Sequence, residues 1–376
     1  MQTISFVCCV LFVLFTFAYL YFLQPNLIAQ EQHYFSHGRT SYDGLLGACL
    51  VTLLLTLLGL ILQRVLRLSH SYLSLAWMPS CYFLGVLTSF HFPCFPSDAH
   101  GVPIFMLVAM PLLFFLLLYL EKTLPKSSLK GSELRSLLTL NVKSLFLMFL
   151  CVGTLGNTSS RLHYELRASH LASHSQYMEA LEVADNTKDV TPYLTAVRAY
   201  ALSCRNQLGD RLFHYPMSNT SSSLLPDPND TLRAYGVSRL IYSHLGYFPV
   251  FKNSFSPKHF LTHAVELDTL NASPVTDYLL CAHLLDADLP SFASLFFAKK
   301  DTTQQSKLET HYKEALLLYE KQTAEPDSFT CINDSVRLAY TDFIFTKDSL
   351  RNNLSVIENC KRRFGKTYWF YFHFMR

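Results

Sequence analysis

The chain has 376 residues, of which 50% are hydrophobic and 16% are charged, and its formal net charge is +3. Apolar residues are commoner and charged residues rarer than in an average soluble protein, which excludes an ordinary soluble chain. The imbalance lies in residues 1–156, because residues 157–376 hold 23 basic and 23 acidic residues, and this formal neutrality argues against a nucleic-acid partner.

Five apolar segments in the first part of the chain are each about long enough for a helix to cross a bilayer. We expect spans near 4–23, 45–62, 72–92, 102–120 and 137–156. The first is interpreted as a retained span rather than a signal peptide, because no Lys or Arg precedes it and no small-residue cleavage site follows. Pro111 predicts a kink in the fourth. The fifth is the weakest, because Lys143 lies inside it, and an interfacial helix is the alternative.

Lys and Arg residues in the short loops predict the orientation of these spans. The loops after the second and fourth spans carry six such residues, namely Arg64, Arg67, Lys122, Lys126, Lys130 and Arg135. The loops after the first and third spans carry only Arg39. We therefore expect a cytoplasmic N-terminus, a transmembrane domain over 1–156 and an extracytoplasmic domain over 157–376. In a bacterium these lie in the inner membrane and the periplasm.

The first outer loop, residues 24–44, is the most polar part of the membrane half. Its side chains with acid, base or metal-binding chemistry are Glu31, His33, His37, Arg39 and Asp43. The favoured interpretation is a solvated loop whose Tyr and Phe side chains lie at the interface. The alternative is that these residues line a site.

Helix signals recur throughout residues 157–376. Thr191-Pro192, Ser256-Pro257 and Ser273-Pro274 each place a capping hydroxyl before a proline at the first helical position, and Leu289-Pro290 is a weaker example. The predicted helices are 160–174, 176–185, 192–208, 231–246, 257–269, 274–286, 290–299, 303–323, 329–346 and 349–363. Their lengths and short connections are typical of stacked antiparallel helix pairs. Residues 216–230, rich in Ser, Pro, Asn and Asp, are expected to form an exposed loop.

Some of these helices resemble tetratricopeptide repeats. Residues 177–181 (YMEAL) and 312–316 (YKEAL) share an aromatic-x-x-Ala-Leu spacing, and Leu208-Gly209 and Leu245-Gly246 resemble the step where paired helices approach closely. Residues 263–268 (HAVELD) resemble the end of a second repeat helix. No strict 34-residue period is present, so the resemblance is to a degenerate array over about 160–350, and an irregular all-α domain is the alternative.

The layout of the whole chain also resembles an uncharacterised family of bacterial inner-membrane proteins. The residues that carry this resemblance are 31–35 (EQHYF) and 206–213 (NQLGDRLF). It implies N-terminal spans followed by a tetratricopeptide-like domain outside the membrane, and it implies no activity, catalytic residue or cofactor. The apolar run 368–374 (YWFYFHF) either docks on the preceding helices or marks a shortened array.

No cluster of polar residues in the sequence is assigned as a catalytic, cofactor-binding or metal site. His163, Arg167, His170 and His174 share a helical face, but Arg167 would repel a cation and a polar exposed face is favoured. His259, His263 and Glu266 also share a face but lack the zinc-protease pattern. Asp286 and Asp288 have Asp-x-Asp spacing, which capping and turn formation explain. Cys204, Cys281, Cys331 and Cys360 are interpreted as free thiols, with disulfides as the alternative outside the cytoplasm.

Two functions follow from these expectations. The favoured one is a membrane-anchored scaffold, with membrane lipids around its spans and a protein or peptide partner on the helical array. The alternative is a polytopic envelope enzyme, such as a lipid-linked glycosyl- or acyl-transferase, with Glu31 or Asp43 as its acid, base or metal group. The scaffold is favoured because the predicted spans contain almost no ionisable residues, which intramembrane sites usually require.

Overall fold

The computed structural model describes residues 2–89, 104–123, 134–185, 187, 190–218, 220–228, 234–249, 256–267, 274–299, 308–323, 332–349 and 355–375. In these ranges every regular element is helical, so the fold class is all-α. The chain divides into two compact units, Met1–His163 and Tyr164–Arg376.

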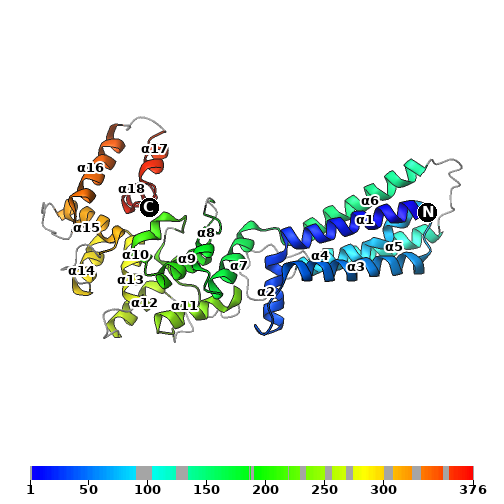
Figure 1. Ribbon diagram of the computed structural model, residues 1–376, viewed down its shortest axis with the longest axis horizontal. Helices are drawn as coiled ribbons and strands as arrows, with labels where there is room; N and C mark the ends of the chain where they lie inside the picture. The colour runs from blue at the N-terminus through cyan, green and yellow to red at the C-terminus, as the bar shows by residue number, and fades with distance from the viewer. Residues whose placement is uncertain are drawn as a thin grey trace. The chain divides into compact units, whose positions relative to one another are not determined.

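Among the residues that the structure describes, three helices of the first unit are long and apolar enough to cross a membrane, by length and composition. They are α1 (Gln2–Ala18) with its π-helical continuation η1 (Tyr19–Leu23), α3 (Gly44–Leu66) and α6 (Leu134–Leu155). These correspond to the first, second and fifth expected spans, and α1 packs against both α3 and α6 (Figure 1). The fourth expected span forms α5 (Ile104–Thr123), which contains Pro111.

The third expected span is not one continuous helix. A 3₁₀ segment, η2 (His70–Trp77), leads into α4 (Met78–Ser89), and the backbone of Tyr72 is not helical. Pro79 lies in the first turn of α4, where the N–H that a proline lacks has no partner within the helix. Trp77 is fully buried, so η2 contributes to the core of the unit.

The segment after α1 is a helix, not the solvated loop expected from its composition. Helix α2 (Pro25–Phe35) begins with a proline at its first position, where the missing N–H costs nothing. It packs against α3 and α4, at the end of the bundle opposite residue 2 (Figure 1). This packing buries Gln30 and Glu31, of which 2% and 5% remain exposed. Some polar residues of this segment, such as Glu31, are therefore buried, whereas others, such as Arg39, are exposed.

The second unit is a stack in which each helix from α12 to α18 packs against the next one along the chain (Figure 1). The helices after α6 are α7 (Ser160–Ser173), α8 (Tyr177–Glu182), α9 (Pro192–Cys204), α10 (Leu208–Arg211), α11 (Val237–Leu245), α12 (Pro257–Leu267), α13 (Pro274–Leu285), α14 (Leu289–Lys299), α15 (Thr310–Thr323), α16 (Asp334–Ser349), α17 (Ser355–Phe364) and α18 (Tyr368–Phe374). Short 3₁₀ turns are η3 (Leu212–His214), η4 (Ser221–Leu224) and η5 (Ala234–Gly236).

The proline signals locate the helix starts. The Thr191 hydroxyl accepts a hydrogen bond from the Leu194 N–H at 3.2 Å, which caps α9 as predicted. Helices α12 and α13 begin at Pro257 and Pro274, also as predicted. Helix α14 begins one residue before the predicted position, because Asp288 rather than Leu289 supplies the cap.

Residues 216–230 are not the exposed loop that their composition predicts. At the centre of this segment, η4 packs against α9, α12 and α13. Ser223, Leu224 and Leu225 are all buried, and the Ser223 hydroxyl donates to the Thr220 carbonyl at 2.6 Å. Local hydrogen bonds of this kind satisfy the backbone, so a Ser-rich segment can enter a core without regular structure. Residues 219, 229 and 230 lie outside the described ranges.

Gly209 allows α10 to approach α15 closely, as the Leu-Gly step suggested. A Cβ atom at this position would lie 2.6 Å from Cζ of Tyr312, so a larger residue would push the two helices apart. Tyr312 is itself fully buried. The contact therefore depends on the absence of a side chain at residue 209.

Helix α18 docks on the preceding helices and does not leave its apolar run uncovered. Tyr368, Trp369, Phe370 and Tyr371 are each at most 5% exposed. The indole N–H of Trp369 donates to the Glu314 carbonyl at 3.1 Å, and the Tyr368 N–H donates to the Glu314 carboxylate at 2.8 Å. That carboxylate also accepts from His311 at 2.9 Å, so one residue of α15 fixes the start of α18.

We expect the fragment 157–376 to fold alone and Trp369→Ala to weaken it strongly. The substitution removes a buried aromatic side chain, which typically costs about 3–5 kcal/mol. The wild-type fragment should give a helical circular-dichroism spectrum and one cooperative urea transition, and the variant a much lower midpoint.

Phe345→Ala is the matched control, because Phe345 is 71% exposed on α16. Its free energy of unfolding should change by no more than about 0.5 kcal/mol. Equal losses in the two variants would show that α18 does not anchor the stack.

Candidate functional site

A buried polar cluster closes the α2 end of the first unit. We call the side chains of Tyr19, Gln24 and Thr88, with residues Asn157 and His163, the bundle-end cluster. The Gln24 amide donates to the Tyr19 hydroxyl at 3.2 Å and to the Asn157 carbonyl at 3.1 Å. His163 Nε2 lies 3.1 Å from the same carbonyl. Tyr19 and Thr88 are joined through their hydroxyls at 3.2 Å, and the Asn157 N–H donates to the Thr88 carbonyl at 2.8 Å.

Gly156 makes room for this cluster. A Cβ atom at Gly156 would overlap the Tyr19 hydroxyl and lie 2.9 Å from Thr88 Oγ1. The π-helical turn η1 contains Tyr19 and sets its direction at the end of α1. Single π-helical turns inside α-helices occur frequently at functional sites.

The geometry fixes the direction of each hydrogen bond. Thr88 Oγ1 donates to the Leu84 carbonyl at 3.0 Å, so it accepts from Tyr19. His163 Nε2 faces a carbonyl, which only accepts, so the hydrogen lies on Nε2. Two acceptor atoms are then left buried without a partner among the described residues, Gln24 Oε1 and His163 Nδ1. Burial also lowers the pKa of His163, which keeps its ring neutral.

Glu31 is a second buried acceptor on α2. One of its carboxylate oxygens is buried and has no hydrogen-bond partner in the described part of the chain. Burial raises the pKa of Glu31 to about 8. Glu31 lies on the same face of α2 as Gln24, about two turns further along, which corresponds to a rise of about 10 Å.

The other residues of the first outer segment do not share the environment of Glu31. Asp43 is exposed, and its carboxylate accepts from the Leu46 N–H at 2.9 Å as the cap of α3. His37 and Arg39 are exposed, and His37 adopts a left-handed backbone with φ of 52°. His33 packs beneath Gly38, where a Cβ atom would lie 3.1 Å from its ring. Asp43 therefore does not form an acid pair with Glu31.

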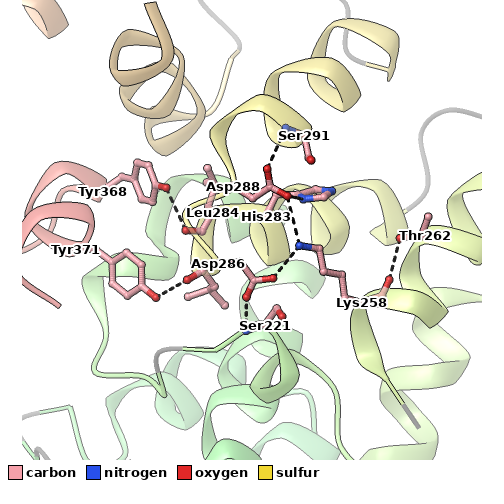
Figure 2. Close-up of polar contacts among 11 residues, drawn as sticks. Ser221, Lys258, Thr262, His283, Leu284, Asp286, Asp288, Ser291, Tyr368 and Tyr371 are labelled. Atoms are coloured by element: carbon pink, nitrogen blue, oxygen red, sulfur yellow. Dashed lines mark hydrogen bonds and ion pairs between the residues drawn. The ribbon is translucent and has the colours of Figure 1, made fainter. Parts of the chain in front are cut away.

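The Asp-x-Asp pair of the second unit holds helices together. Figure 2 shows Asp286 accepting from the Ser221 N–H at 3.3 Å and from Lys258 Nζ at 2.9 Å. Asp288 caps α14 through the Ser291 N–H at 3.2 Å, and its other oxygen faces Lys258 at 3.5 Å and His283 at 3.3 Å (Figure 2). All four carboxylate oxygens are engaged, and a lysine ammonium lies where a cation would bind. Capping explains Asp288 as predicted, whereas the carboxylate of Asp286 makes tertiary contacts with η4 and α12 that the sequence did not predict.

The residues of the two predicted histidine faces lie in different surroundings. His170 and His174 stack with ring centroids 4.5 Å apart, and His174 Nδ1 bonds the His170 carbonyl at 2.8 Å. His163 turns instead toward Asn157. His259, His263 and Glu266 are all exposed on α12. Among the residues that the structure describes, no three His, Cys, Asp or Glu side chains are placed to hold a metal ion.

The three described cysteines of the second unit, Cys204, Cys281 and Cys360, are free, and Cys331 lies outside the described residues. Cys204 is near His244 Nδ1, at 4.0 Å, while Ser203 Oγ is 2.9 Å from His244 Nε2. A serine hydrogen-bonded to a histidine is one element of a serine-nucleophile site, but in such sites a carboxylate usually orients the histidine through its other ring nitrogen. Here a thiol takes that place. Sequence reasoning missed this contact because α9 and α11 join it only through packing.

Comparison with known proteins identifies a family. A family model described as "Family of unknown function (DUF6057)" matches residues 73–250 and 260–375, which together make up well over half of the chain. No curated protein and no solved structure matches the chain.

Burial of Glu31 predicts that the first unit loses stability as the pH rises. The carboxyl group binds its proton more tightly in the folded protein than in the unfolded one, so stability falls between the ordinary glutamate pKa of 4.5 and the folded value of about 8. We expect the melting temperature of the detergent-solubilised full chain to fall between pH 5 and pH 8, and Glu31→Gln to reduce that fall.

Asp43→Asn is the control, since it removes a carboxylate from the same segment and keeps a capping oxygen. This variant should retain the pH dependence of the wild type. If the melting temperature of Glu31→Gln fell with pH as steeply as that of the wild type, Glu31 would not be the group responsible for the loss of stability.

Proposed function

The chain belongs to this family of unknown function, DUF6057, and we propose that it is a membrane-anchored interaction scaffold. The first unit anchors it with five spans in a bacterial inner membrane, its N-terminus in the cytoplasm. The second unit is a degenerate tetratricopeptide-like array in the periplasm, and it presents a surface to a protein or peptide partner. The three long apolar helices support the anchor, and the Lys and Arg bias of the loops supports the orientation.

The observation that carries the proposal is an exposed apolar face on α16. Leu338 and Phe345 are each 71% exposed, and their spacing of seven residues places them on one side of the helix, two turns apart. Ile357 of the neighbouring helix α17 is 54% exposed. Large aromatic and aliphatic side chains at helical spacing are the usual anchors for a partner on a helical surface.

The neighbouring helix α17 carries exposed basic residues near its end. Lys361, Arg362 and Lys366 are exposed at the end of α17 and in the turn after it. Arg363 is committed to Asp342 of α16 at 2.8 Å, which joins the two helices. We call Leu338, Phe345, Ile357 and these exposed cations the α16–α17 surface. Its charge favours an acidic partner, because complementary potentials speed and orient association.

The enzyme alternative rests on Glu31. A buried carboxyl with a raised pKa is a feature of acid–base sites. Its buried oxygen bonds no second acid–base group among the described residues, and Asp43 is occupied as a helix cap. A lipid-linked glycosyl- or acyl-transferase therefore stays the second candidate.

The orientation is tested by fusing a reporter enzyme that is active only outside the cytoplasm. We expect strong activity for a fusion after Lys188 and none after Lys126, because the fifth span lies between them. Equal protein levels of the two fusions are the control. The opposite pattern would place the array in the cytoplasm and remove the envelope scaffold.

The partner surface is tested by Phe345→Glu and Leu338→Glu. A charge in the centre of an apolar contact is desolvated without a partner, so both variants should reproduce the phenotype of deleting the gene. Melting temperatures should stay near that of the wild type, because both side chains are exposed.

Leu267→Glu provides the matched control, since Leu267 is 56% exposed on α12, outside the α16–α17 surface. It should leave the phenotype of the wild type intact. If Phe345→Glu retained the wild-type phenotype, the α16–α17 surface would not be the binding site for the partner.

A further inference from the structure

Helix α16 has two opposite faces, of which one is exposed and the other is packed. Leu338 and Phe345, which belong to the α16–α17 surface, mark the exposed face. Because an α-helix has 3.6 residues per turn, Tyr340 and Phe343 lie on the opposite side of α16. Phe343 is fully buried and Tyr340 is half-buried. This side is the inner face of α16.

Helix α18 packs against the inner face of α16. The ring centroid of Tyr340 lies 5.2 Å from that of Trp369, and the ring centroid of Phe343 lies 5.5 Å from that of His373. Trp369 is itself buried. The inner face of α16 is therefore supported by α18.

His373 places an ionisable ring in this apolar contact. Its Nε2 atom is buried and has no hydrogen-bond partner among the described residues. Burial, followed by the charge of Lys347, lowers the pKa of His373 to about 4, against the opposing effect of Asp348. A proton on His373 would place a charge beside the Phe343 ring, where less water solvates it than in a released helix.

His214 lies beside the contact that fixes the start of α18. Its ring centroid is 5.4 Å from that of His311, whose Nδ1 bonds the Glu314 carboxylate at 2.9 Å. The same carboxylate accepts from the Tyr368 N–H at 2.8 Å. Burial is the largest cause that lowers the pKa of His214 to about 4. The titratable groups that also act on His214 are His311, Arg211 and Lys366, which lower its pKa, and Asp210, which raises it.

We propose that α18 is an acid-sensitive latch for the α16–α17 surface. Protonation of His373 and His214 releases α18 from the stack, and the inner face of α16 then loses its support. The release follows from the contacts of the two histidines, whereas its effect on a partner rests on the proposed function. Acid weakens partner binding without any change in the side chains of the exposed face.

The acids on the neighbouring helices have partners of their own. Asp342 of α16 pairs with Arg363 of α17 at 2.8 Å, and Glu320 of α15 pairs with Arg337 of α16 at 2.5 Å. Asp348 is the acid that acts on His373, and burial outweighs its effect.

The lowered pKa values fix the sign of the pH dependence. A histidine whose pKa is about 4 in the docked state, below its ordinary value of 6.5, takes up a proton when α18 is released. Docking is therefore fully stabilised above pH 6.5 and weakens as the pH falls toward 4. Each proton taken up changes the ratio of released to docked α18 by about tenfold per pH unit. This direction is opposite to the one expected for Glu31 in the first unit.

The test uses the full chain in detergent, labelled with 5-fluorotryptophan. The chain has two tryptophans, so fluorine NMR gives one resonance from Trp369 on α18 and one from Trp77 in the first unit. The pH is lowered from about 7.5 to about 5, which stays above the ordinary pKa of carboxyl groups. We expect the Trp369 resonance to move to the position of an exposed indole and that of Trp77 to stay.

His373→Phe and His214→Phe each remove an ionisable group and keep an aromatic ring. The ratio of released to docked α18 should change by about 100-fold per pH unit in the wild type and about tenfold in each variant. The double variant should stay docked at the lowest pH. His263→Phe is the matched control, since His263 is exposed on α12, and it should titrate like the wild type.

An unmoved Trp369 resonance in the wild type, or an equal movement in the double variant, overturns the latch. The position of this resonance at neutral pH shows whether each variant still docks α18. Because the two histidines make separate contacts, a single variant that fails to dock leaves the other as the test.

Hydrogen exchange of residues 332–349, corrected for its intrinsic pH dependence, tests the link to α16. We expect the protection of this segment to fall when α18 is released and to persist in the double variant. Release of Trp369 with unchanged protection of α16 would reject control of the α16–α17 surface. No partner enters these measurements, so a wild-type phenotype of Phe345→Glu would reject the proposed function and leave the release of α18 intact.

Discussion

The second unit depends on one helix end, the last turn of α13. The final carbonyls of a helix have no partner within it and must find donors elsewhere. Here the Leu284 carbonyl accepts from the Tyr368 hydroxyl at 3.1 Å, and the Leu285 carbonyl accepts from the Tyr371 hydroxyl at 2.8 Å (Figure 2). Directly after them, Asp286 and Asp288 bind segments of α12, η4 and α14. One turn of α13 thus connects α18, the last helix of the stack, to helices in the middle of the stack. The hydrogen bonds from the two tyrosine hydroxyls to these carbonyls stabilise the docked position of α18.

Much of the helical order could be predicted because its signals are local. Thr191-Pro192 and Ser256-Pro257 act within one turn, and the structure begins helices there. The failures came where tertiary packing decides. Residues 216–230 look like a surface loop, yet Leu224 is fully buried in η4, which packs against α9 and α13. Hydropathy predicted a span over 72–92 but could not predict that the segment begins as the 3₁₀ helix η2 and becomes the α-helix α4 at Met78.

The site was harder to predict, for the same physical reason. The interpretation of Asp288 succeeded because capping is a short-range effect, whereas the contacts of Asp286 with Ser221 and Lys258 depend on tertiary packing. Glu31 was noticed, but its burial depends on α2 packing against α3 and α4, which composition does not reveal. The bundle-end cluster has no sequence pattern, since Tyr19, Thr88 and Asn157 meet only when three separate helices end together.

Gly156 carries a consequence for the evolution of the family. The space that its side chain would occupy is filled by the hydroxyl of Tyr19, which reaches across from another helix. A relative that acquired any larger residue at this position would have to give up the hydroxyl at position 19 or the turn that directs it. The two positions should therefore covary among relatives, although 137 residues separate them. Such a pair would identify the end of the bundle in sequences whose apolar spans have otherwise diverged.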